Sequence, residues 1–289
     1  MPDREATIHA AERTTRGLRV IVGRLGTKEH PRGRILSAYR NAHRALRDVL
    51  RRVRGAQAIG EAREVLEALR REVLAAGETA LGSAVVLGRK QAEVEAEVWE
   101  LGPLGIQTPN TRAALEGWIG TVDSQTAYAV AAIATEVDPV LILGDDARAG
   151  RLRYSDVTRA GAQWVTWTVM QALMLALEEP SVRSGIVWDK QVIAAIDERT
   201  TDCCLQAQGQ IVPYDSDFKL TGTPRYADEL PWTPFHDYCR TSVVQVPHEF
   251  AEDDLTQQMR AAARAELQAR EETGITVEIH PSHARSRRG

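Results

Sequence analysis

Two short clusters hold the side chains of this chain that are best suited to chemistry. The first is 197–204 (DERTTDCC), and the second is 234–240 (PFHDYCR). The chain has three cysteines, Cys203, Cys204 and Cys239, and all of them fall inside these clusters. Three cysteines are too few, and odd in number, for a disulfide framework. The sequence therefore directs attention to metal binding or thiol chemistry.

Zinc is the first possibility. His236 and Cys239 are spaced so that both side chains can turn toward one point from a short turn, and Cys204 adds a third soft ligand. Adjacent cysteines diverge, so Cys203 is a poor partner for the same ion. Thr201 stands where the first residue of a Cys-x-x-Cys pair would be. We expect Cys204, His236 and Cys239 to lie close together as a possible zinc site.

Other interpretations of these residues stay open. The thiols of Cys204 and Cys239 can be reduced and simply pack, or they can form a disulfide in an oxidising setting. His236 can hydrogen-bond within its loop and bind nothing. Nucleophilic catalysis by a Cys–His pair is also conceivable, since a nearby imidazolium lowers a thiol pKa. No oxyanion-hole signature or third orienting residue accompanies it.

The two clusters resemble the phage Mu F-like head morphogenesis proteins, which are minor capsid proteins of tailed bacteriophages. The residues that carry the resemblance are Asp197, Arg199, Thr200, Cys204, Gly209, Pro234, His236, Cys239 and Arg240, with Trp188 upstream and Cys203 within the first cluster. The resemblance is specific over about 184–246. Thr201 and Thr233 depart from the family, replacing its usual first cysteine and the first of two prolines.

The resemblance implies a structural role in the virion. Family members are encoded beside the portal protein and packaged near the portal vertex in low copy number. We therefore expect a non-enzymatic protein of the head interior or portal vertex, present in the host cytoplasm during assembly. Its expected partners are the portal and capsid proteins, with possible non-specific contact with packaged DNA and no membrane. No cofactor is implied with certainty, although zinc is possible.

The net charge of −4 hides an asymmetry. Residues 1–54 carry 14 Lys+Arg and 5 Asp+Glu, a balance of +9, so 55–289 carries −13. A basic stripe at helical spacing runs through this arm: Arg40, Arg44, Arg47, Arg51 and Arg54. These residues are candidates for contact with an acidic portal surface or with DNA phosphates. The alternative is a solvated helix face beside the protein's own acidic half.

The hydrophobic periodicity predicts mostly helices. Expected helices cover 34–53, 61–75, 78–101, 112–136, 156–179 and 249–272, and strands are expected within 185–196 and 240–246. We expect Gly77 to end the second helix, Thr111 to cap the fourth and Pro180 to end the fifth. The last helix has a thin apolar stripe, so we expect it to pack on a partner or lie on the surface.

These elements indicate an α+β fold that is mostly α-helical, in which an N-terminal helical region precedes a helical, small-sheet, loop-rich Mu F-like module. The expected domains are 1–105 (basic helical region), 106–248 (Mu F-like domain) and 249–289 (charged helix and basic tail). The apolar stretch 162–177 is 16 residues long. A membrane span needs about 20 residues, so this stretch is expected to be a core helix.

Two other functions remain as alternatives. A zinc-dependent nuclease or hydrolase would use Cys204, His236, Cys239 and Asp197, with Arg199 or Arg240 stabilising a phosphate or oxyanion. A cellular DNA-binding adaptor would use the basic arm. In a purely structural module, the two arginines should instead be at least partly buried and paired with Asp197 or with backbone carbonyls.

Overall fold

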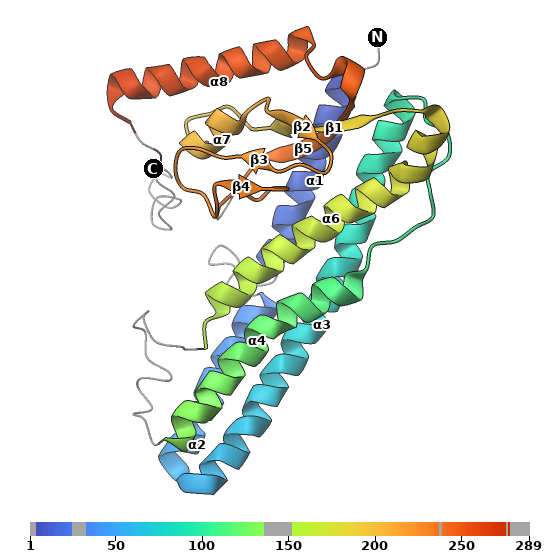
Figure 1. Ribbon diagram of the computed structural model, residues 1–289. Helices are drawn as coiled ribbons and strands as arrows, with labels where there is room; N and C mark the ends of the chain where they lie inside the picture. Colours follow the sequence, from blue (N-terminus) through green and yellow to red (C-terminus); the bar gives the residue numbers. More distant parts are fainter. Residues whose placement is uncertain (1–3, 25–32, 136–151, 237–238, 276, 278–289) are drawn as a thin grey trace. The chain divides into compact units, whose positions relative to one another are not determined.

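The computed structural model describes residues 4–24, 33–135, 152–236, 239–275 and 277. Its larger helices are α1 (Arg4–Arg24), α2 (Arg34–Arg52), α3 (Gly55–Val98), α4 (Thr111–Ala134), α6 (Tyr154–Ser184) and α8 (Asp254–Thr273) (Figure 1). The remaining elements are β1 (Trp188–Ile193), α7 (Asp202–Ala207), β2 (Ile211–Pro213), β3 (Phe218–Lys219), β4 (Glu229–Leu230), β5 (Ser242–Pro247) and the 3-10 turn η1 (His248–Phe250). The tail 280–289 and its arginines lie outside the described residues.

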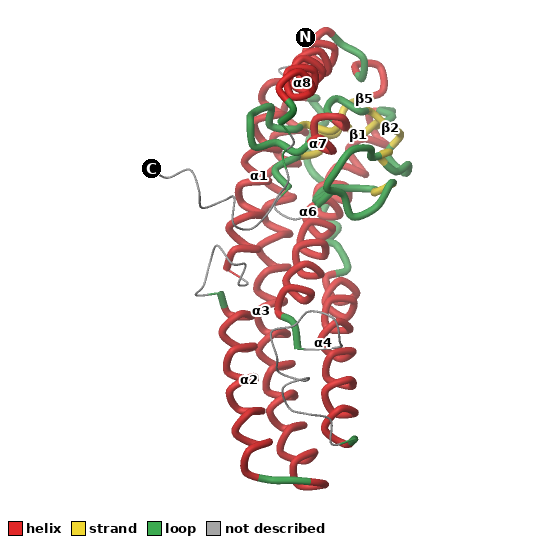
Figure 2. Tube along the Cα trace, turned by 90° about the vertical axis from the view of Figure 1, so that its left-hand side faces the viewer, coloured by secondary structure: helices red, strands yellow, loops and turns green. Residues whose placement is uncertain are grey.

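The fold is α+β and mostly helical, as the sequence predicts. Among the described residues, all strands lie in the segment from β1 to β5. They form an antiparallel sheet of order β2-β1-β5 and a separate β3-β4 pair. Figure 2 shows these strands in yellow within a largely helical chain. The sheet therefore belongs to the part of the chain that carries both clusters.

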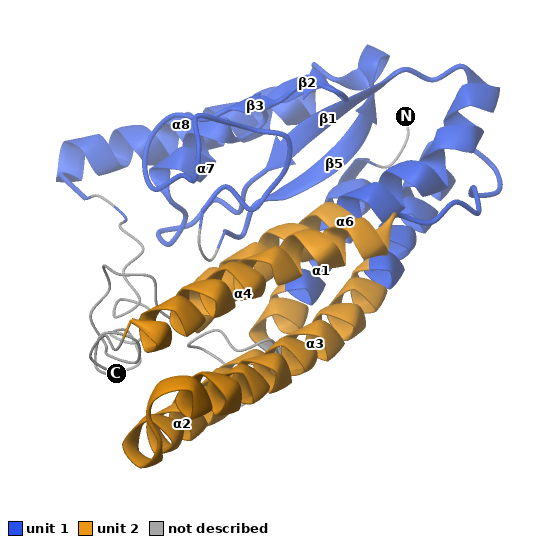
Figure 3. Ribbon diagram, turned by 60° about the horizontal axis from the view of Figure 1, so that its bottom comes forward, with its two compact units in different colours: residues 1–18, 85–109, 169–289 blue, residues 19–84, 110–168 orange. Residues whose placement is uncertain are grey.

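The chain divides into two compact units, which Figure 3 colours separately. Unit 1 comprises 1–18, 85–109 and 169–289, and unit 2 comprises 19–84 and 110–168. Neither unit is contiguous in sequence, whereas the expected regions 1–105, 106–248 and 249–289 are. Helices α1, α3 and α6 each supply residues to both units, so domain boundaries at loops do not coincide with this division.

Unit 2 contains α2, all of α4 and parts of α1, α3 and α6, and these helices contribute buried apolar residues to it. The prediction that Gly77 ends a helix is wrong, because α3 runs through it without a break. A Cβ atom at position 77 would lie 2.7 Å from Cδ1 of Leu115 and 3.3 Å from the ring of Trp118. The glycine therefore allows close approach of α4, and Trp118 is itself fixed by its indole N–H, which donates to the carbonyl of Val157 at 2.8 Å.

Two other helix boundaries differ from expectation. Asn110, and not Thr111, caps α4, since its side chain accepts a hydrogen bond from the Ala113 N–H at 3.1 Å. Pro180 lies inside α6, which continues to Ser184. Proline cannot donate to the carbonyl of Ala176, but that carbonyl instead accepts the N–H of Gly105 at 2.8 Å. A neighbouring loop thus satisfies the group that the proline leaves free.

The apolar stretch of α6 supplies core residues. Val165, Val169, Leu173 and Leu177 are all buried. Within the described residues, no helix combines the length and apolarity that crossing a membrane requires. The expectation of a core helix is consistent with this burial.

Unit 1 places α1 and α8 on one face of the sheet. Ile193 of β1 and Val244 of β5 pack against Ala11 of α1 and Met259 of α8. The expectation that the last helix packs on a partner or lies on the surface therefore misses its contact with its own sheet. The helix begins at Asp254, because Asp253 accepts the Thr256 N–H at 2.9 Å and caps it.

Candidate functional site: a buried Cys–His–Cys cluster and its pinned loops

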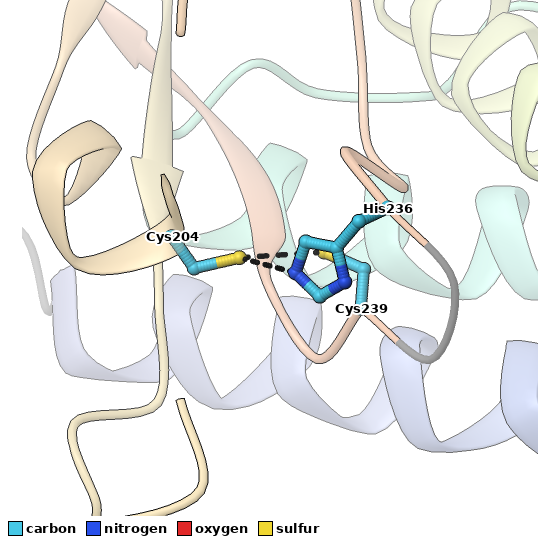
Figure 4. A group of neighbouring side chains, drawn as sticks. All are labelled: Cys204, His236 and Cys239. Atoms are coloured by element: carbon cyan, nitrogen blue, oxygen red, sulfur yellow. Dashed lines mark hydrogen bonds between the residues drawn. The ribbon is translucent and has the colours of Figure 1, made fainter. Parts of the chain in front are cut away.

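Cys204, His236 and Cys239 come together in unit 1 as the sequence predicts. Cys204 lies on α7, and the other two residues lie in the loop before β5 (Figure 4). Their ligand atoms all lie within 4.8 Å of one another. The Sγ of Cys204 lies 3.0 Å from Nε2 of His236 and 3.7 Å from Sγ of Cys239. Of the described residues, these three form the one group with metal-ligand geometry.

Thr201 also contacts this cluster. It precedes the first residue of α7, and its Oγ1 lies 2.9 Å from Nε2 of His236. The residue at the position where the resembling family has a cysteine is therefore in contact with the histidine. The donor set is thus two sulfurs, one imidazole nitrogen and one neighbouring oxygen.

The distances fit a zinc ion with small adjustments. Zinc binds thiolates at about 2.3 Å, which places two sulfurs of a tetrahedral site about 3.8 Å apart. The separation of 3.7 Å between the two Sγ atoms matches that value. The approach of Nε2 to the Cys204 Sγ is closer, at 3.0 Å, and the three ligand atoms lie within 4.8 Å of one another, so His236 would have to shift to bind the same ion. The residues therefore fit zinc with Cys204, His236 and Cys239 as ligands.

Two of the three ligand residues are buried, which bears on the chemistry of the cluster. Cys204 is 2% exposed and His236 is 3% exposed, whereas Cys239 is partly exposed. Hydrogen bonding with Cys203, aided by burial, raises the pKa of Cys204 to about 11. Burial, followed by the neighbouring Cys204, raises the pKa of Cys239. Without a metal, both groups are neutral thiols, the opposite of the low-pKa nucleophile that thiol catalysis requires.

The cysteines and His236 are arranged in a way that bears on the alternatives left open by the sequence. All three cysteines are free, so the structure contains no disulfide among them. The hydrogen bond between His236 and Thr201 fits the interpretation in which the histidine is satisfied within its loops. Packed thiols and a bound zinc use the same atoms at nearly the same distances. Bound zinc accordingly stays a prediction for these residues.

An ion pair joins the two clusters beside the cysteines. Arg240 Nη1 donates to one carboxylate oxygen of Asp197 at 2.6 Å, and Nη2 donates to the other. The same Nη2 donates to the hydroxyl of Thr200 at 2.9 Å. Thr200 in turn donates to the carbonyl of Ala195. Hydrogen bonds from Arg240 hold the pKa of Asp197 well below its usual range. The Asp-x-Arg-Thr motif thus pins loops by the means expected from the sequence.

Arg270 of α8 completes this arrangement, and sequence reasoning missed it. Its guanidinium is 6% exposed and donates to the carbonyls of Thr200 at 2.6 Å and Asp197 at 3.0 Å. It also bonds the carboxylate of Asp202 at 3.0 Å. Periodicity cannot identify this role, because Arg270 lies among the many charged residues of its helix. The tertiary contact alone distinguishes it.

The remaining motif residues take mixed roles. The prediction of a buried Arg199 is wrong: its side chain is exposed, and its bond to Asp197 comes from its backbone N–H at 2.9 Å. Gly209 has a φ of +71°, and a Cβ there would lie 2.7 Å from the Arg260 side chain. Cys203 is buried on α7 outside the ligand group. Pro234 precedes the buried Phe235.

The basic stripe lies on unit 2. Arg40, Arg44, Arg47, Arg51 and Arg54 are all exposed, while the apolar residues of α2 face the opposite, buried side. Arg54 donates to the carbonyl of Val53 at 3.0 Å, which draws it toward the helix end. The other four guanidinium groups present positive charge to solvent along about 17 Å of helix, at a rise of about 1.5 Å per residue.

Comparisons of the chain with protein-family models, with curated proteins and with solved structures found no match. The resemblance to Mu F-like proteins therefore depends on the two clusters alone. Their shared location in unit 1 is a property of the structure and does not require that resemblance. What the arrangement does chemically is hold loops together, either through a metal or through hydrogen bonds.

Proposed function

We propose that the protein is a structural component of a tailed-bacteriophage head, a minor capsid protein of the Mu F-like type. The observation that carries the proposal is the convergence of the resembling residues on one pinned module. Hydrogen bonds among Asp197, Thr200 and Arg240 connect the two loops. A second contact between them is the cluster of Cys204, His236 and Cys239. Such an arrangement serves rigidity, which a protein built into a particle needs.

Zinc is proposed as the element that locks this module. Structural zinc sites have closed ligand sets, whereas catalytic sites keep a position open to substrate or water. The burial of Cys204 and His236 favours the first type. When bound, the ion would supply cross-linking of α7 to the loop before β5. The protein residues would orient the ligands and exclude water, which argues against the nuclease or hydrolase alternative.

The exposed arginine stripe is the proposed contact for a polyanion. Arg40, Arg44, Arg47 and Arg51 offer their charge to solvent on the face of α2 opposite the core. Packaged DNA or an acidic portal surface would be bound without sequence readout, because phosphate contacts carry no base information. This surface also fits the cellular DNA-binding adaptor, so particle association is needed to separate the two functions.

The deciding experiment is isolation of phage particles and assembly intermediates from infected cells. We expect the chain to co-purify with heads and with the portal protein, at a low and constant copy number. Variants that weaken the ion pair between Asp197 and Arg240, such as Asp197→Asn, should be incorporated into heads less well than the wild-type protein. The absence of the chain from both particles and intermediates would contradict the proposal.

A further inference from the structure

Strand β5 forms one edge of the main sheet, and α3 covers that edge with side chains. Gln91 Nε2 donates to the carbonyl of Val243 at 3.2 Å. Glu95, one helical turn later, accepts a hydrogen bond from the backbone N–H of Gln245. Backbone groups two residues apart on an antiparallel strand face the same edge. The two helix side chains therefore take the place of a neighbouring strand.

The residues of this contact and their neighbours carry unpaired polar atoms. Five buried side-chain atoms of unit 1 have no hydrogen-bond partner among the residues that the structure describes: Gln91 Oε1, Glu95 Oε2, Trp99 Nε1, Gln245 Nε2 and Tyr214 Oη. Gln91 and Glu95 lie one turn apart on α3, and Trp99 follows one turn later, just past the end of the helix. The charge of Glu95 contributes to the raised pKa of Tyr214, after burial, so this hydroxyl also lies within its electrostatic reach.

Such a concentration requires an explanation. Gln91 is 1% exposed, Glu95 0%, Gln245 2% and Trp99 9%. Buried polar atoms in proteins are nearly always paired with protein groups or with ordered water. A flip of the Gln91 amide does not help, because its nitrogen already donates to two acceptors, Glu95 Oε1 at 2.8 Å and the Val243 carbonyl. The partner must come from outside the side chains.

We propose that ordered water is bound in the interior beside Glu95, where it bridges Glu95 Oε2 and Gln91 Oε1 to the N–H groups of Trp99 and Gln245. The water completes the hydrogen bonding of the α3 side chains that cover the free edge of β5. Its site is formed by three residues that follow one helix face and one residue of the strand that they cover.

The chemistry of the donor set distinguishes water from a cation. A sodium or potassium ion would bind the oxygens of Glu95 and Gln91 and would neutralise a buried carboxylate. The indole N–H of Trp99 and the amide N–H groups of Gln245 carry partial positive charge, and a cation accepts no hydrogen bond. A water molecule both accepts and donates hydrogen bonds, so it can serve the unpaired N–H donors and the unpaired oxygens of this site, whether the Glu95 carboxyl is ionised or protonated. Burial also raises the pKa of Glu95 to about 8, which lessens the need for a counter-ion at neutral pH.

The test is detection of long-lived water by NMR in the full-length protein. We expect nuclear Overhauser transfer from water to the Trp99 indole proton and to the Gln245 side-chain amide, with the sign of a rigidly bound molecule and not of chemical exchange. Trp118 provides the matched control. Its indole is also buried but donates directly to the Val157 carbonyl at 2.8 Å, so it should show no such transfer.

Two outcomes would overturn the proposal. One is a Trp99 indole proton that receives no transfer from water, as at Trp118. The other is a site that holds a cation: exchanging sodium or potassium chloride for choline chloride would then move the Trp99 indole resonance. Glu95→Gln provides a second measurement, since its amide oxygen still accepts. The water signal at Trp99 should persist in that variant, and its loss there would also contradict the bridging geometry.

Discussion

Arg240 and Asp197 form a two-pronged ion pair across 43 residues of chain, with Arg240 Nη1 donating at 2.6 Å to one carboxylate oxygen and Nη2 donating to the other. The pair joins the start of the first cluster to the end of the second. Because the Arg240 side chain is 19% exposed and the Asp197 side chain 42%, solvent partly screens the contact. The ion pair therefore links two loops, and its removal should cause a measurable but moderate loss of stability.

Breaking this ion pair should destabilise unit 1. We expect Arg240→Met to lower the free energy of unfolding by about 1–3 kcal/mol, since it removes charge-assisted hydrogen bonds and leaves Asp197 without them. Arg199→Met is the matched control, because the exposed Arg199 side chain should be worth less than about 0.5 kcal/mol. Denaturant titration measures both. Equal losses in the two variants would show that the pair contributes nothing specific.

Metal analysis tests the Cys–His–Cys cluster. Protein purified without chelator is expected to contain close to one zinc per chain, and Cys204→Ser, Cys239→Ser or His236→Ala should each lose it. Cys203→Ser is the control, because this neighbouring buried thiol lies outside the ligand group and should leave the zinc content unchanged. A zinc content near zero in the wild-type protein would establish that the three side chains simply pack and hydrogen-bond.

Two glycines of α3 should respond to alanine in opposite directions. A Cβ at Gly88 would lie 2.2 Å from the carbonyl oxygen of Val169, so Gly88→Ala must displace backbone and should cost about 1–3 kcal/mol. At Gly82 no atom lies within 4 Å of the added Cβ, so Gly82→Ala should stabilise by about 0.5–1 kcal/mol. Thermal unfolding checks both, and a stabilising Gly88→Ala would contradict the close helix contact.

The buried carboxyl of Glu95 should make stability depend on pH. Its pKa is raised to about 8 in the folded protein, mainly by burial, against about 4.3 in an unfolded chain. Between these values the folded state keeps a proton that the unfolded state releases, so the free energy of unfolding should fall as pH rises from about 4.3 to 8.

Glu95→Gln isolates this effect. The variant keeps every other titratable group, including the buried Tyr214 hydroxyl and the exposed Glu178. The difference between the two proteins in unfolding free energy should therefore grow with pH up to about 8 and then level off. Parallel curves for wild type and variant would mean that Glu95 is not buried as a neutral acid.

The arginine stripe predicts a salt-dependent affinity for DNA. Neutralising Arg44 and Arg47 to Gln should weaken binding at all sequences and reduce the slope of log affinity against log salt by about 2, since each arginine neutralises one phosphate. Arg63→Gln with Arg71→Gln changes the net charge equally on the exposed side of α3 and is the control. If both pairs reduce the slope alike, net charge and not the stripe is responsible.

Local signals were sufficient for much of this protein. The apolar periodicity of α2 and of the stretch at 162–177 predicts helices that bury those residues, because the repeat of 3.6 residues places them on one face. The spacing within the two clusters predicts that Cys204, His236 and Cys239 meet. These features depend on short stretches of chain, whose geometry neighbouring residues determine.

Only the tertiary structure decided the features that join distant segments. Gly77 and Pro180 are helix-ending residues by local rules, yet the approach of Leu115 and the N–H of Gly105 make a continuous helix favourable at each. Arg270 has no local signature that separates it from its charged neighbours. Gln91 and Glu95 likewise look like surface residues until α3 meets the edge of β5. The energies of such groups depend on burial and on partners that sequence spacing does not contain.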